Sequence, residues 1–429
     1  GTEMVRILLS KGAKPSELSD AGIAENDLGR GMKYWIDKAR RVGTPSPEKL
    51  KHLAKLSPMD RVHELDYAVV GEEPAISVIQ EALAARFGNP QGSRGKPLVM
   101  LLLGPPGHGK TYLSRNAARS LVGEENFLFV PCQSIRDDAD LFGSRLGGAR
   151  FGEYSSEGQL TQWLRERQKK KCIVFLDEFE KMKDLTSSLD WGQAKKIYQS
   201  FLEPWQDGSL SDQSAGAGGQ HLSSTSAGGH KIDCSQSIWI MTSNWGQQEI
   251  IDFCEQNKDR MQSKIDEKDV AWIQKELVKK ILRSLCMREF ASVHEDLKAL
   301  CRRIDVIVPF LPFTNPERKV VADIAVSDRF SLYREPCMLT GPEERRRSFG
   351  NLHLRGTRAF AAYAADSYDP MQGASGMLSA VRQADGKFQM MNVRGKLWLT
   401  LDQEEKIMSE RPAEVIDISF WVHFDREAE

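Results

Sequence analysis

A loop in the first third of the chain has the residue types and spacing of a phosphate-binding site. Gly104, Gly109, Lys110 and Thr111 stand in the order Gly-x-x-x-x-Gly-Lys-Thr, directly after an apolar run at residues 98–103. Glycines let the main chain approach phosphate oxygens, and the N–H groups that open the following helix face the anion. We therefore predict a nucleotide site in which Lys110 contacts the outer phosphates and Thr111 coordinates magnesium.

Two further polar groups follow apolar runs. Asp177 and Glu178 come after residues 172–176, and Asn244 comes shortly after residues 238–241. The carboxyl edge of a parallel sheet is where ligands bind in open α/β sheets. Asp177 is expected to support the magnesium ion, and Glu178 to polarise the attacking water. Asn244 can orient the same water, and the alternative is that it only caps the next turn.

The elements that must position these residues are short buried strands alternating with helices. Five runs are apolar throughout, as strands buried on both faces should be: residues 98–103, 127–130, 172–176, 238–241 and 306–308. Their alternation with helical stretches predicts a three-layer α/β core with a parallel sheet.

Changes in pattern along the chain predict three segments. We expect a helical N-terminal segment with a linker over residues 1–59, a large α/β domain over 60–310 and a smaller domain over 311–429. The smaller domain is mostly helical to Val381, and alternating runs at 390–401 and 415–424 predict strands at its end.

Bulk composition restricts the class of protein. Charged residues make up 28% of the 429 residues and the net charge is -1, so no basic field favours nucleic acid. No apolar stretch of about 18 residues predicts a membrane span, and no secretory signal pattern opens the chain. The seven cysteines form no Cys-x-x-Cys pair. We therefore expect thiols in a reducing intracellular compartment, cytoplasmic or mitochondrial.

Together the three motifs resemble those of the AAA+ ATPases, and specifically of the Clp-type unfoldases and disaggregases. The resemblance runs from about Ser57 to Val381. It implies an α/β fold, an AAA+ three-layer parallel-sheet ATPase domain followed by a smaller, mainly helical domain. It also implies ATP and Mg²⁺ as cofactors, a homo-oligomeric ring, hexameric in this family, and polypeptide substrates. We see no tripeptide loop of the kind that docks these ATPases onto a peptidase.

The resemblance assigns further residues to the nucleotide. Val69, Val70 and Gly71 are similar to the segment that frames adenine in this family, and His108 is expected to point outward from the loop. The assigned nucleotide contacts are Val69, Val70, Gly71, Gly104, Pro105, Pro106, Gly107, His108, Gly109, Lys110, Thr111, Tyr112, Asp177 and Ile324. Arg303 takes the position of the arginine finger, which acts on the nucleotide of a neighbouring subunit.

Two positions resemble the first pore loop, which grips polypeptide in Clp-type rings. Phe151 matches the gripping aromatic residue, and Tyr154 follows three residues later. The alternative is that Phe151 anchors a surface loop. Two departures from the family stand out, because Arg150 replaces a glycine of the pore-loop signature and Ser375 replaces an arginine that senses the γ-phosphate.

The N-terminus and the function each have two interpretations. Residues 5–14 resemble the closing helix and turn of an ankyrin repeat, although an ordinary amphipathic helix explains them as well.

One possible function of the whole chain is that of an ATP-driven protein remodeller, favoured by the intact nucleotide-site residues. The other is an ATP-dependent switch or scaffold that oligomerises without threading substrate, favoured by Ser375 and the altered pore loop. A DNA-loading ATPase is disfavoured by the neutral charge.

Overall fold

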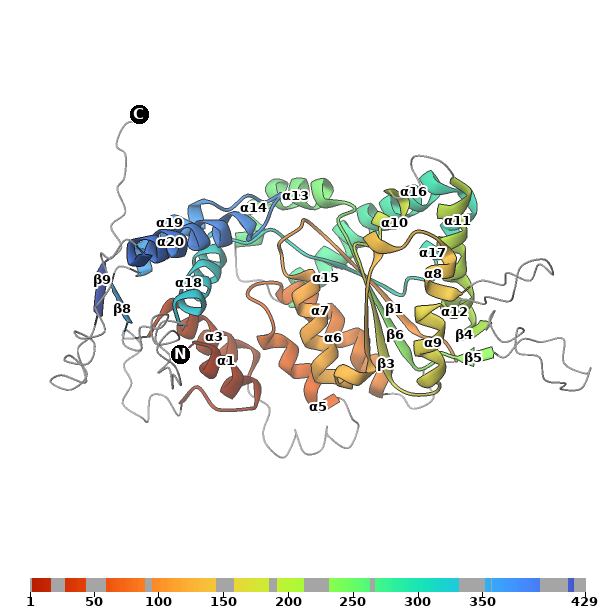
Figure 1. Ribbon diagram of the computed structural model, residues 1–429, viewed down its shortest axis with the longest axis horizontal. Coiled ribbons are helices and arrows are strands. Elements are labelled where there is room, and N and C mark those ends of the chain that lie inside the picture. Colours follow the sequence, from red (N-terminus) through yellow and green to blue (C-terminus); the bar gives the residue numbers. More distant parts are fainter. Residues whose placement is uncertain are drawn as a thin grey trace, which may run out of the picture. The chain divides into compact units, whose positions relative to one another are not determined.

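The computed structural model describes eleven stretches of the chain, in two compact units (Figure 1). One unit is made of residues 1–44 with 313–429, and the other of residues 45–312. The described residues are 2–16, 28–43, 59–88, 95–143, 158–184, 191–211, 231–262, 267–331, 352–355, 357–393 and 416–419.

A five-stranded parallel sheet forms the centre of the 45–312 unit. Its strands are β1 (Leu98–Leu103), β2 (Phe127–Pro131), β3 (Cys172–Asp177), β6 (Ser237–Ser243) and β7 (Val306–Pro309). They lie in the order β2-β3-β6-β1-β7. Each apolar run that predicted a strand lies within one of them, and the predicted parallel sheet is confirmed.

Helices cover both faces of this sheet (Figure 1). Alternate residues of a strand point to opposite faces. In β1, accordingly, Leu101 and Leu103 belong to a buried cluster with Trp239, while Met100 and Leu102 belong to a second cluster on the other face. The first cluster is covered mainly by α9 (Gln159–Glu166), α11 (Trp191–Ser200), α12 (Leu202–Asp207) and α16 (Arg283–Val293). The second is covered by α6 (Glu73–Gly88) and α7 (Lys110–Val122). The three-layer prediction therefore holds.

The helices of this unit follow the chain between the strands. They are α5 (Met59–Val62), η2 (His63–Tyr67), α6 (Glu73–Gly88), α7 (Lys110–Val122), η3 (Glu124–Asn126), η4 (Cys132–Ser134), α8 (Asp138–Phe142), α9 (Gln159–Glu166), α10 (Lys181–Asp184), α11 (Trp191–Ser200), α12 (Leu202–Asp207), α13 (Gln247–Gln256), α14 (Lys258–Gln262), α15 (Glu267–Ile273), η5 (Gln274–Leu282), α16 (Arg283–Val293), η6 (Glu295–Leu297) and α17 (Lys298–Cys301). A short antiparallel pair, β4 (Ser209–Ser211) and β5 (Lys231–Asp233), completes the unit.

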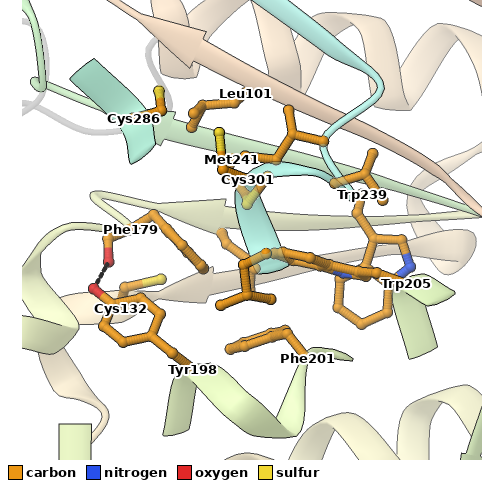
Figure 2. Close-up of a cluster of buried hydrophobic side chains, with 14 of the residues drawn as sticks. Leu101, Cys132, Phe179, Tyr198, Phe201, Trp205, Trp239, Met241, Cys286 and Cys301 are labelled. Carbon is orange, nitrogen blue, oxygen red and sulfur yellow. Dashed lines mark hydrogen bonds between the residues drawn. The ribbon is translucent and has the colours of Figure 1, made fainter. Parts of the chain in front are cut away.

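The larger buried cluster is rich in aromatic rings (Figure 2). Phe179, which follows β3, meets Tyr198, Phe201 and Phe290 edge to face, with ring centroids 5.3, 5.7 and 6.3 Å apart. Such pairs each contribute about 0.5–1.5 kcal/mol beyond the area that they bury. The Tyr198 hydroxyl also donates to the Phe179 carbonyl oxygen at 3.1 Å. The turn that follows β3 is therefore anchored in the core.

The second unit combines the two ends of the chain. Its helices are α1 (Thr2–Ser10), α3 (Arg30–Val42), α18 (Asn315–Ser331), α19 (Thr357–Asp366) and α20 (Ser375–Val393). Two strands, β8 (Leu352–Arg355) and β9 (Ile416–Ser419), pair in parallel.

Two polar contacts tie the helices of this second unit together. The Gly31 N–H donates to Asp323 Oδ2 at 3.1 Å, which joins α3 to α18. Arg329 Nε donates at 2.6 Å to Asp385 Oδ2, on a side chain that is 1% exposed. The residues at the N-terminus therefore pack with the smaller C-terminal domain, whereas the sequence pattern predicts a separate segment over residues 1–59.

The smaller domain differs from the prediction at two places. Residues 390–393 continue α20 instead of starting a strand, because a short apolar run fits a helix end as well as a strand. The strand β8 lies in a region predicted to be mostly helical, while β9 lies within the predicted run 415–424. The ankyrin resemblance of residues 5–14 stays a prediction, since the described stretch that contains them, residues 2–16, holds α1 and the turn after it but no full repeat. In the described part of the chain, no helix is long and apolar enough to cross a membrane.

Candidate nucleotide site

The loop between β1 and α7 requires glycine at its first and last turns. Gly104 has a φ of +150° and Gly109 a φ of +86°, which residues with a Cβ rarely adopt. A Cβ at Gly104 would lie 2.6 Å from the Phe310 carbonyl oxygen, and one at Gly109 would lie 3.4 Å from Val69 Cγ1. The loop is thereby packed against the residue that follows β7 and against the segment predicted to frame adenine.

Lys110 is held inside this loop. Its Nζ donates to the carbonyl oxygens of Gly104 and Pro105 at 2.6 and 2.8 Å, and to Asn244 Oδ1 at 3.1 Å. Burial lowers the pKa of Lys110 to about 8, against the opposing effect of four nearby carboxylates, those of Glu180, Glu72, Asp177 and Glu178. Lys110 therefore keeps its positive charge at neutral pH, close to the N-terminus of α7, where anions are favoured.

Thr111 and Asp177 meet, as predicted from two motifs 66 residues apart. Thr111 Oγ1 donates to Asp177 Oδ1 at 2.9 Å, and the Thr242 hydroxyl donates to the same oxygen at 2.7 Å. Magnesium is commonly held in proteins by one or two carboxylates together with substrate phosphates and water. Among the described residues, no group of three or more His, Cys, Asp or Glu side chains could hold a metal ion. The pair fits a magnesium ion that arrives with a nucleotide.

Glu178 occupies a strained turn. Its φ is +54°, an uncommon value for a residue with a Cβ, and such strain clusters at functional sites. The Glu178 N–H donates to Thr242 Oγ1 at 3.0 Å, and the Phe179 N–H donates to the Thr242 carbonyl oxygen at 2.8 Å. Thr242 therefore holds the turn that carries Glu178, while the ring of Phe179 fixes it in the core.

Sequence reasoning missed Glu180 and Thr242 as site residues. Glu180 Oε1 accepts a hydrogen bond from the Asn244 N–H at 3.1 Å, and Thr242 contacts both Asp177 and Glu178. A polar residue closing an otherwise apolar strand was a signal for Thr242. Nothing in the spacing distinguished Glu180 from an exposed carboxylate after a strand.

His108 does not point outward, contrary to the sequence prediction. Its side chain is 1% exposed, and its Nδ1 lies 3.2 and 2.9 Å from the carbonyl oxygens of Pro105 and Pro106. Carbonyl oxygens only accept, so Nδ1 carries the proton. Burial lowers the pKa of His108 to about 4, which keeps the ring neutral at physiological pH. The imidazole therefore closes the loop from inside.

The remaining predicted nucleotide contacts lie in different parts of the structure. Val69 is buried beside the loop, Gly71 has a φ of +70°, and the Tyr112 side chain is 55% exposed at the start of α7. Ile324 lies on α18 in the other unit, where a Cβ at Gly31 would be 3.0 Å from its Cγ1.

Arg303 lies just before β7, after the end of α17. Its Nη2 donates to Gln206 Oε1 at 2.5 Å, and its buried Nε has no hydrogen-bond partner among the described residues. Ser375 is the first residue of α20 in the other unit. The two pore-loop candidates, Phe151 and Tyr154, lie outside the described residues.

Comparisons with known proteins agree with this geometry. Residues 96–284 match the family model of the AAA domain (Cdc48 subfamily). The chaperone protein ClpB of Clostridium tetani (strain Massachusetts / E88) is 27% identical over 332 residues, which is 76% of this chain and 31% of ClpB. The ClpC ATP-binding subunit of the ATP-dependent Clp protease of Staphylococcus aureus (strain USA300) is 27% identical over 373 residues, or 84% of this chain and 37% of ClpC. These matches support the resemblance to Clp-type AAA+ ATPases that the sequence motifs indicate.

A solved structure supports the fold of this chain. It is the closed-state cryo-EM reconstruction of Hsp104 with ATPγS and FITC casein, with a TM-score of 0.51 and 21% identity, covering 84% of this chain and 52% of that one. The AAA+ architecture predicted from sequence is thus confirmed. The chain spans about a third of the length of the ClpB and ClpC relatives named above.

Proposed function

We propose that this chain hydrolyses ATP, with Mg²⁺ as cofactor, to remodel polypeptides. The observation that carries the proposal is the meeting of Lys110, Thr111, Asp177 and Asn244 through hydrogen bonds at one edge of the sheet. These groups come from three motifs that are distant along the chain, and they match the parts of an ATP-hydrolysing site.

Each side chain has a definite task in the proposed reaction. Lys110 exchanges its carbonyl and amide partners for the outer phosphate oxygens and balances their charge. Glu178 takes the proton of the attacking water, and Asn244 orients that water. Thr111 and Asp177 would hold a magnesium ion, which supplies positive charge to the β- and γ-phosphates.

The proposed ring would place Arg303 at the nucleotide of a neighbouring subunit. Its guanidinium donates to Gln206, and its buried Nε has no hydrogen-bond partner in the part of the chain that the structure describes, so the group is only partly engaged there. Arginine stabilises the charge of the transferred phosphoryl group in the transition state. A hexamer is the proposed state, in keeping with the family resemblance.

Mixing two inactive variants tests whether Arg303 acts between subunits. Arg303→Ala and Lys110→Ala should each lose ATPase activity, the first by up to roughly 10³–10⁵-fold, as for the trans fingers of GTPases. Mixed rings contain some interfaces that pair an intact loop with an intact finger, so activity should partly return. Exposed Arg302 is the second candidate for the finger, and Arg302→Ala is tested in the same mixture. Co-assembly proven by sedimentation, without any return of activity, would rule out action between subunits.

The remodelling step is tested by ATPase rate and sedimentation, with and without an unfolded protein such as casein, which was present in the Hsp104 reconstruction. A remodeller should assemble with ATP, hydrolyse it faster with casein and recover an aggregated model substrate.

In that assay Phe151→Ala should keep assembly and basal hydrolysis but lose recovery of the aggregated substrate. Assembly with ATP but no response to casein and no recovery would instead favour the switch or scaffold, as Ser375 suggests.

A further inference from the structure

The main-chain N–H of Asn244 has no acceptor within the sheet. Ser243 is the last residue of β6 and lies opposite Leu103 of β1, while pairing with β3 ends at Met241 opposite Leu176. The N–H of Asn244 therefore lies beyond the ladder, and a half-buried N–H of this kind needs another acceptor. Glu180 Oε1 provides it at 3.1 Å.

The bonds between the ends of β3 and β6 are reciprocal. In the turn after β3, the N–H groups of Glu178 and Phe179 donate to Thr242 at 3.0 and 2.8 Å. In the opposite direction, the N–H of Asn244 donates to a carboxylate oxygen of Glu180 in the same turn. The same turn carries Glu178, and the Asn244 side chain accepts from Lys110. Glu180 thus joins the segment bearing the proposed base to the segment bearing the proposed water-orienting amide.

The second oxygen of Glu180 distinguishes this residue from a surface carboxylate. Oε2 is buried and has no hydrogen-bond partner among the described residues. Leaving a buried carboxylate oxygen unpaired is unfavourable. An apolar side chain of the same size would avoid this cost, so the presence of a carboxylate here indicates a role at the site.

We propose that Glu180 is a positioning residue of the hydrolysis centre, which acts by fixing the main chain of Asn244. This inference rests on the proposed ATPase function. It makes the acceptor oxygen the essential feature of Glu180, and it separates Glu180 from Glu178, whose task needs a carboxylate that can take a proton.

The test compares two substitutions of similar length. Glu180→Met keeps the bulk of the side chain and removes the acceptor, whereas Glu180→Gln keeps an acceptor oxygen and removes the charge. Glu180→Met should lower kcat by roughly 10- to 100-fold, the size of effect that small misplacements produce, while KM for ATP changes by less than about threefold. Glu180→Gln should restore most of the lost kcat. The exposed Glu255→Ala, on α13, is the control and should match the parent protein.

Two further measurements separate positioning from other roles. In an Asn244→Ala background, Glu180→Met should cost little more activity, because the group through which it acts is already gone. Hydrogen exchange in the nucleotide-free protein should show a faster Asn244 amide in Glu180→Met, with the β3 amides unchanged. If Glu180→Met unfolds, Glu180→Ala replaces it in each comparison.

The outcomes that overturn the proposal are distinct from a failure of the function. A Glu180→Gln variant as slow as Glu180→Met would assign the role to charge, and multiplied losses in the double variant would make the two residues independent. An unchanged Asn244 exchange rate would refute the contact itself. A parent protein that hydrolyses no ATP would refute the proposed function, whereas the exchange measurement would still decide the contact.

Discussion

Lys110→Ala is expected to remove measurable ATP binding. The lysine is the one described cation whose Nζ bonds to the main chain of the phosphate loop, with its charge retained at neutral pH despite burial. Hydrogen bonds to charged groups contribute about 1.5–3 kcal/mol each. Losing two such bonds to phosphate oxygens should weaken ATP binding by roughly 10²–10⁴-fold. Isothermal titration calorimetry measures this directly.

The control for Lys110 is Lys170→Ala, an exposed lysine in the turn before β3, which should bind ATP like the parent protein. The parent itself offers a second check. In the nucleotide-free protein, Lys110 has a pKa of about 8, and a bound phosphate favours the charged form of its side chain. Affinity should therefore be level below pH 8 and fall as the pH rises above it. Unchanged calorimetric affinity in Lys110→Ala would remove the phosphate-loop assignment.

Glu178→Gln is expected to bind ATP and to hydrolyse it very slowly. Glutamine keeps the shape of the side chain and the strained turn, since the turn is held by the main-chain N–H groups of Glu178 and Phe179, which donate to Thr242. It cannot take a proton from water, and general-base catalysis contributes about 10²–10⁴-fold in rate. The variant should accumulate as an ATP-loaded assembly, visible as a larger sedimenting species with intact nucleotide.

The comparison with Glu255→Gln, an exposed glutamate on α13, separates the loss of this carboxylate from a general loss of charge. The control should turn over ATP at the parent rate. A Glu178→Gln variant with parental turnover would show that Glu178 is not the base. Glu180 would then be the carboxylate to examine in that role, because it lies in the same turn.

Local patterns in the chain were enough for the sheet and for the main outline of the site. Each strand is a continuous apolar run because both of its faces are buried, and that signal needs no knowledge of the partner strand. The glycine spacing before Lys110 carries its own reason, since a Cβ at Gly104 would collide with a backbone oxygen. The parallel sheet then brings Thr111 to Asp177, because the carboxyl ends of parallel strands share one edge.

The tertiary structure decided the partners that are distant along the chain and the environment of each group. Thr242 and Glu180 became site residues only when β3 and β6 lay side by side, because a hydrogen bond depends on distance and direction, which residue spacing does not give. His108 turned inward, and the Lys110 pKa fell, because packing removed water from both side chains. The placement of α1 and α3 with the C-terminal helices was likewise decided by packing, since an amphipathic helix specifies a buried face but not the surface that covers it.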